Sequence, residues 1–123
     1  MRIPLLVSAL VALFPALQPA AAQDAASGAK LFAQRCQACH SLEPGGAARV
    51  GPNLSVVFGG AAAAKDFPYS PALARSGLVW DAATLDAYLA APAKTVRGTK
   101  MTVGVPDATQ RADIIAFLKT LAE

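Results

Sequence analysis

The stretch CQACH, from Cys36 to His40, contains both cysteines and the only histidine of this 123-residue chain. Thiols and imidazoles are the side chains that most readily bond to a cofactor, bind a metal or exchange electrons. Three kinds of site are therefore open at the start: a disulfide or thiol redox pair, a metal centre, and the attachment point of a prosthetic group.

The spacing within this motif separates the three kinds of site. A thiol redox pair usually opens a helix that follows a strand, whereas this pair closes a helix predicted over Ala26–Cys39. A zinc site needs four ligands, and the motif supplies three in a chain without another cysteine or histidine. Cys-x-x-Cys-His is the signature of c-type haem attachment. We therefore predict one haem c, with thioethers from Cys36 and Cys39 and with His40 as the proximal iron ligand; a plain disulfide is the alternative.

The second axial ligand follows by elimination. His40 is the only histidine, and of the two methionines Met1 would leave with an amino-terminal signal. Met101 remains, in the loop RGTKMT between two predicted helices, where a buried gap-filling role is less natural. We predict that Met101 is the distal ligand, with an open or otherwise filled sixth position as the alternative. Two occupied axial positions favour outer-sphere electron transfer and argue against oxygen binding or peroxidase chemistry.

The first residues have the pattern of an export signal. Arg2 precedes the apolar run Leu5–Leu17, and three alanines end at Ala22. We predict a cleaved signal peptide over 1–22 and one domain over 23–123, with an uncleaved membrane anchor as the minor alternative. The formal net charge of +3 would lose only Arg2, and so small an excess gives no support to nucleic-acid binding.

Helix signals alternate with long loops along the predicted domain. Between Ser41 and Tyr69, glycine and proline recur every few residues, which is typical of loop. Capping residues and apolar stripes predict further helices over 70–77, 81–91 and 107–123. The segment from Ala93 to Pro106 is predicted to be loop. We expect an all-α fold of four to five helices whose long loops wrap around the covalent haem, which supplies the missing core.

Several blocks resemble class I cytochromes c, of the mitochondrial type and its bacterial relatives, and occur in the family's order. GAKLFAQRCQACH resembles the amino-terminal helix of the family, whose counterparts of Gly28 and Phe32 pack against the carboxy-terminal helix. In this chain the matching surface would be Ile114, Phe117 and Leu118. GPNL, YSPALARSGLVW, TLDAYL and AAPAKTVRGTKM are similar to later family blocks. The resemblance implies the small cytochrome c fold over almost the whole mature chain.

The resemblance also implies roles for side chains around the haem. Pro52 would help to hold the proximal histidine, with a simple turn as the alternative. Tyr69 and Trp80 would hydrogen-bond a haem propionate. Tyr88 would face the axial methionine, and Thr99 would lie beside the haem. For Trp80 and Tyr88 the alternative is an ordinary place in the core.

Some positions depart from the family pattern. Gly60 stands where mitochondrial members commonly have an arginine near a propionate. Leu73 stands where an asparagine often joins the ligand network, and Arg97 replaces the usual proline of the ligand loop. The loop after Met101 looks one residue short and has no aromatic residue. We therefore expect the haem edge and the reduction potential to differ from those of mitochondrial proteins.

These observations predict a periplasmic cytochrome c that carries single electrons between redox enzymes and is not itself an enzyme. One alternative is a dedicated electron-accepting partner or subunit of one dehydrogenase or oxidoreductase, and a weaker one is an open-site haem catalyst or sensor. The resemblance places Arg35, Lys94, Arg97 and Lys100 around the haem edge, where membrane and periplasmic redox proteins would dock, unless they are ordinary surface residues. We expect a monomer, no nucleic-acid partner and, after signal removal, no stable membrane insertion.

Overall fold

The computed structural model describes residues 15 and 23–123, so all of the predicted signal segment except Pro15 lies outside the described residues. Within the described part the regular structure is helical, with one isolated antiparallel bridge between Ala61 and Val79 and no strand. The helices are α1 (Ala25–Arg35), α2 (Pro71–Ala74), α3 (Ala82–Ala90), α4 (Pro92–Thr95) and α5 (Ala108–Thr120). The predicted all-α class and the number of helices are confirmed.

Helix α1 ends earlier than the predicted residue 39. The backbone carbonyl of Phe32 accepts hydrogen bonds from the amides of both Cys36 and Gln37, at 2.8 and 3.0 Å. This double acceptance widens the last turn and ends the regular i to i−4 ladder after Arg35. The CQACH motif therefore lies in a separate turn, where the amides of Cys39 and His40 both donate to the Cys36 carbonyl at 3.0 Å.

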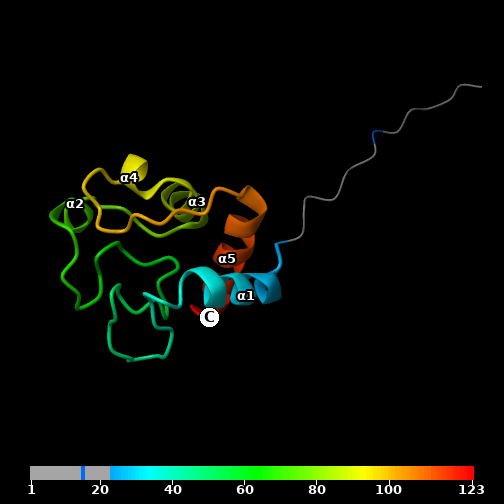
Figure 1. Cartoon of the computed structure of the whole chain (residues 1–123), viewed down its shortest axis with the longest axis horizontal. Coiled ribbons are helices and arrows are strands. Elements are labelled where there is room, and N and C mark those ends of the chain that lie inside the picture. Colours follow the sequence, from blue (N-terminus) through cyan, green and yellow to red (C-terminus); the bar gives the residue numbers. More distant parts are fainter. Residues whose placement is uncertain (1–14, 16–22) are drawn as a thin grey trace, which may run out of the picture.

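Helices α1 and α5 cross and pack directly against each other, as Figure 1 shows in cyan and red. Gly28 lies at the crossing, where a β-carbon would overlap the backbone of Asp113. Next to it, the rings of Phe32 and Phe117 pack with centroids 5.7 Å apart. The predicted contact of Gly28 and Phe32 with the carboxy-terminal helix is confirmed. A glycine here lets two backbones approach closely, which fixes the start of the CQACH turn relative to α5.

The predicted caps of three helices are present. Ser70 accepts from the amide of Leu73 at the start of α2, Asp81 from Thr84 at α3, and Asp107 from Gln110 at α5. Each bond satisfies an amide that has no partner within its helix.

The sequence predicts loop directly after α3, but this segment contains the short helix α4. Ala91 leaves the helical region at φ −155° and ψ 87°, and Pro92 then begins the short helix α4. Proline lacks an amide hydrogen and has a fixed φ. It can therefore both end the preceding helix and occupy the first position of the next one.

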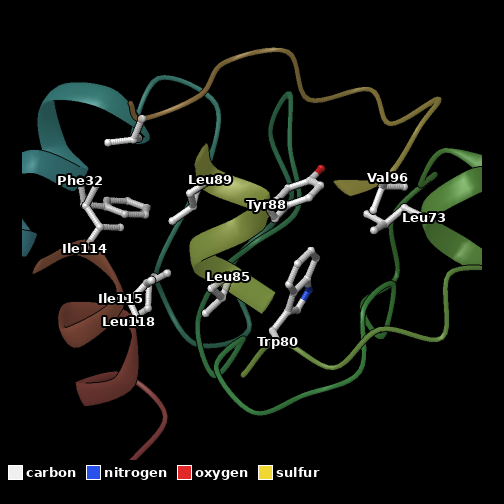
Figure 2. Close-up of a cluster of buried hydrophobic side chains, with 11 residues drawn as sticks. Phe32, Leu73, Trp80, Leu85, Tyr88, Leu89, Val96, Ile114, Ile115 and Leu118 are labelled. Carbon is white, nitrogen blue, oxygen red and sulfur yellow. The ribbon is translucent and has the colours of Figure 1, made fainter. Parts of the chain in front are cut away.

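The buried core is one cluster that extends from α5 past α3 to Trp80 and Tyr88 (Figure 2). Phe32 and the buried face of α5 lie at one end, and the rings of Trp80 and Tyr88 lie toward the other. Leu85 and Leu89 of α3 lie between them. The rings of Trp80 and Tyr88 pack with centroids 4.9 Å apart. The stripe predicted on α5 is confirmed in part: Ile114 and Leu118 are buried, whereas Phe117 and Leu121 are half-buried.

The long loop between α1 and α2 is held by side-chain hydrogen bonds as well as by scattered backbone bonds. Asn53 is buried and donates to the Ser41 hydroxyl and the Glu43 carbonyl, at 3.1 and 2.8 Å. Its amide oxygen accepts from both the amide and the hydroxyl of Ser55, at 2.9 and 2.6 Å. Asn53 therefore satisfies backbone groups that helices and sheets would satisfy elsewhere.

Candidate functional site

A cavity of about 470 Å³ occupies the interior between the helices and the long loop. Most of its lining is apolar and comes from α1, α2, α3, α5 and the loops on either side of them. All nine residues predicted for the site line this one cavity: Cys36, Cys39, His40, Pro52, Tyr69, Trp80, Tyr88, Thr99 and Met101. The fold thus brings residues as far apart in the sequence as Cys36 and Met101, which are 65 positions apart, to the lining of one cavity.

His40 is held in one orientation by the segment Gly51–Pro52. Its Nδ1 lies 2.8 Å from the Pro52 carbonyl oxygen, and a carbonyl can only accept, so Nδ1 carries the hydrogen. The Nε2 lone pair is then free to bind a metal, which is the tautomer a metal-ligating histidine needs. Gly51 lies against the face of the ring, where a β-carbon would come within 2.8 Å of Nδ1. The absence of a side chain at residue 51 makes room for the imidazole.

The two cysteines lie half-buried on the cavity wall and are not joined to each other. Burial raises the pKa of the Cys36 thiol, which outweighs the opposite effect of the nearby Arg35 guanidinium. Thiol redox enzymes need the reverse, a cysteine whose pKa is lowered by a helix amino terminus or a cation. The environment of Cys36 therefore disfavours the thiol–disulfide function.

Met101 is half-buried in the segment that follows α4, and its neighbour Thr99 is tied to α3. The hydroxyl oxygens of Tyr88 and Thr99 lie 2.6 Å apart. Burial raises the pKa of Tyr88, although the bond with Thr99 opposes the shift, so this phenol stays neutral. The Lys100 ammonium donates to the Pro68 carbonyl at 2.7 Å and ties the same segment to the long loop. Two contacts therefore fix the chain immediately before Met101.

At another part of the lining, Tyr69 is joined to a residue that the sequence analysis missed. The backbone amide of Lys65 donates to the Tyr69 hydroxyl oxygen at 3.2 Å, and the Lys65 ammonium donates to the Ser55 carbonyl at 2.7 Å. Burial raises the pKa of Tyr69, so its hydroxyl keeps a hydrogen that it can donate. The sequence signal for Lys65 was slight: one cation directly after the small apolar run GGAAAA.

The predicted basic edge is only partly at the cavity. Arg35 and Lys100 line it, whereas Lys94 and Arg97 are exposed and are not among its lining residues. Leu73, which stands at one of the departures from the family pattern, is buried and lines the cavity. An aliphatic side chain therefore lines the cavity at the position where the resemblance leads one to expect an asparagine.

The residues on the wall fit a haem. An apolar space accepts the macrocycle, two thiols one turn apart can bond to its vinyl groups, and an imidazole with a free Nε2 and a thioether sulfur can bind the iron. In residues 15 and 23–123, no group of three or more histidine, cysteine or carboxylate side chains is arranged to bind a metal by itself. The fold and the site together define a small all-α haem protein.

Comparisons with known proteins agree with this class. The family model described as Cytochrome c matches residues 25–122. Cytochrome c2 from Blastochloris viridis is 41% identical over 116 residues, which cover 93% of this chain and 91% of that protein. Cytochrome c2 from Rhodomicrobium vannielii is 46% identical over 102 residues, or 81% of each chain. The solved structure of cytochrome cH from Methylobacterium extorquens superposes with a TM-score of 0.71 at 48% identity and covers 79% of this chain and 98% of that one.

The chain belongs to the cytochrome c family, as a class I member. It is an electron carrier that works with redox partners, carries one covalently bound haem c and is not an enzyme. The predictions of family, fold, cofactor and electron-transfer class are confirmed.

Proposed function

We propose that this protein is a periplasmic carrier that moves single electrons between redox enzymes, with His40 and Met101 as the axial ligands of its haem. In this proposal Cys36 and Cys39 form the thioethers. The observation that carries it is the convergence of these four residues on one apolar cavity, with the His40 tautomer set by the Pro52 carbonyl.

The bound haem supplies an iron that can alternate between two oxidation states, and the protein controls access to it. With the His40 imidazole and the Met101 thioether both bound to the iron, no coordination site would be left for a substrate. The apolar lining excludes water and gives the site a low dielectric, which makes the potential sensitive to nearby charges. Electron transfer by a haem held in this way would make and break no bond.

Four further side chains support the ligands and the haem edge in this proposal. Trp80 and Tyr69 donate to a propionate, since both line the cavity and the Tyr69 hydroxyl has its hydrogen free. Tyr88 and Thr99 form one hydrogen-bonded pair next to the Met101 segment. Because the Tyr88 ring also packs on Trp80, a change at the propionate end can reach the ligand end through two contacting rings.

The periplasmic location rests on the amino-terminal sequence and on the relatives. The signal-like segment 1–22 precedes a domain that begins at residue 23, and the matched bacterial proteins are cytochromes c2 and cH. Among the described residues, no helix has the length and apolar character needed to cross a bilayer. The proposal includes cleavage after Ala22 and a monomeric mature protein, with an uncleaved anchor as the minor alternative.

We place the docking surface for redox partners at the haem edge, with Arg35, Lys94, Arg97 and Lys100 as its cations. All four are exposed. Exposed charges act over about one Debye length, so the rate of reaction with an acidic partner should fall steeply between low and physiological salt. A rate that does not depend on salt would remove this part of the proposal.

The ligand assignment is tested by Met101→Ala in the haem-loaded protein. The wild-type ferrous protein should resist carbon monoxide, and the variant should bind it readily and lose the near-infrared sulfur-to-iron band of the ferric form. Val103→Ala, a truncation at a neighbouring lining residue, is the matched control and should keep both properties. Ready binding of carbon monoxide by the wild type would overturn the assignment. Intact mass of the protein from the cell reports haem addition and signal removal together.

A further inference from the structure

We infer that Lys65 is the cation that neutralises a haem propionate in this protein. The inference rests on the proposed function, because it concerns the same cavity. It adds a residue that neither the motif nor the comparisons point to, and it assigns the ligand class as a carboxylate.

The need for a cation comes from the chemistry of haem, which has two carboxylates on one edge. Placing a carboxylate in a mostly apolar cavity is costly unless a charge or several donors compensate for it. Gly60 lines the cavity but has no side chain to offer. Three cationic residues line the cavity within the described chain: Arg35, Lys65 and Lys100.

Of these three, Lys65 is the best placed. Arg35 and Lys100 are exposed, and the Lys100 ammonium is engaged by the Pro68 carbonyl. Lys65 is half-buried, and one of its three ammonium hydrogens is used by the carbonyl of the buried Ser55. Two hydrogens are left for a carboxylate.

The backbone around Lys65 brings it to the same region as the predicted propionate donors. The backbone amide of Lys65 donates a hydrogen bond to the Tyr69 hydroxyl oxygen. The loop that leads to Lys65 is joined to Trp80 by two backbone bonds, from Gly59 to the Trp80 carbonyl and from Trp80 to the Gly60 carbonyl, each 2.8 Å. Lys65, Tyr69 and Trp80 thus line the cavity from segments whose backbones are tied to one another by hydrogen bonds.

A purely structural role is the competing explanation, since the Lys65 ammonium also holds the loop at Ser55. Three substitutions separate the two. Lys65→Gln keeps a donor for the Ser55 carbonyl and removes the charge, Lys65→Met removes both, and Lys65→Arg keeps both. Lys30→Gln is the matched control, because Lys30 is exposed on α1 and does not line the cavity.

The readout is the midpoint potential of the haem-loaded protein, followed by its absorption spectrum. Loss of a nearby positive charge stabilises the more positive ferric state, so Lys65→Gln and Lys65→Met should both shift the potential downward. Lys65→Arg should stay near the wild-type value, and Lys30→Gln should shift it less than Lys65→Gln.

A wild-type potential in Lys65→Gln overturns the inference, whether Lys65→Met shifts or not, because the charge is then irrelevant. The proposed function fails separately, if the wild type lacks the spectrum of a histidine/methionine haem.

Discussion

Gly28 on α1 faces the backbone carbonyl of Asp113 on α5 with no room for a side chain between them. A β-carbon at residue 28 would overlap that carbonyl and would also lie 2.9 Å from the β-carbon of Phe117. Directly beside this contact, a carboxylate oxygen of Asp113 accepts from the amide of Asp24 at 2.9 Å. The two terminal helices of the domain are therefore joined by a backbone contact and a hydrogen bond at one point.

Gly28→Ala should separate α1 from α5 and destabilise the protein. Overpacking of a tight core contact costs about 1–3 kcal/mol, and backbone atoms cannot move aside as a flexible side chain could, so we expect about 2 kcal/mol or more. Thermal unfolding of the haem-loaded protein measures the loss. Gly60→Ala adds the same methyl group where the nearest atom, the Val57 carbonyl oxygen, is 3.4 Å away, and it should change stability little. Equal stability of the two variants would contradict the tight crossing.

Val56 has a backbone that a β-branched residue rarely adopts, with φ of 51°, and its side chain is 58% exposed. Such strain costs about 1–3 kcal/mol, part of which is offset in glycine by the greater freedom of its unfolded chain. Val56→Gly should therefore raise the free energy of unfolding by about 1 kcal/mol, measured by chemical denaturation. Val57→Gly, the same change at a half-buried residue with negative φ, should lower it. A loss of stability in Val56→Gly would argue against strain.

Arg111 fixes the chain that follows Met101. Its guanidinium donates to the carbonyls of Val105 and Pro106, at 3.0 and 2.7 Å, and pairs with the Asp86 carboxylate at 2.7 Å. Hydrogen bonds of charged donors are worth about 1.5–3 kcal/mol each. Arg111→Ala should loosen this segment and raise the apparent affinity of the ferric protein for imidazole about tenfold or more.

Two variants define how that result is interpreted. Asp86→Asn keeps the two carbonyl bonds of Arg111, so it should raise imidazole affinity less than Arg111→Ala does. Arg75→Ala removes an exposed arginine that does not line the cavity and should bind imidazole like the wild type. Unchanged affinity in Arg111→Ala would show that the segment is held without this side chain.

Asp81 should make α3 less stable as the pH falls into the acid range. The hydrogen bond from the Thr84 amide lowers the pKa of its carboxyl below the ordinary value of 3.8. The folded pKa is lower than the unfolded one, so the contribution to stability is complete above about pH 3.8 and is lost as the pH falls through the folded pKa. Unfolding midpoints measured from pH 5 to about 2 should fall more steeply for the wild type than for Asp81→Asn. Parallel curves would contradict this role.

Local features were the ones that the sequence could predict. The caps at Ser70, Asp81 and Asp107 join a side chain to an amide three residues later, so neighbouring residues suffice to specify them. The CQACH motif is equally local. Met101 lies far along the chain, yet elimination singled it out, and it lines the same cavity as the motif; its role as distal ligand stays a prediction.

Features that depend on contacts between distant segments could not be predicted. The early end of α1 depends on where the CQACH turn must go, and the sequence there continues to favour helix. Asn53 looks like any loop asparagine until Ser41 and Glu43 come within reach of its amide. Lys65 gains its importance only when the loop from Ser55 closes on itself. In each case a partner more than nine residues away, or the path of the chain, decides the outcome.

The cavity inside the buried core also affects how the protein is made. Without its haem, the chain would have a void or water against Phe32, Ile114, Trp80 and Tyr88, which all line the cavity. A group that binds only the folded state stabilises it, and here that group fills the centre. If haem is joined to Cys36 and Cys39 after export, as proposed, attachment and folding form one coupled event, and the compartment of attachment is also where the chain becomes compact.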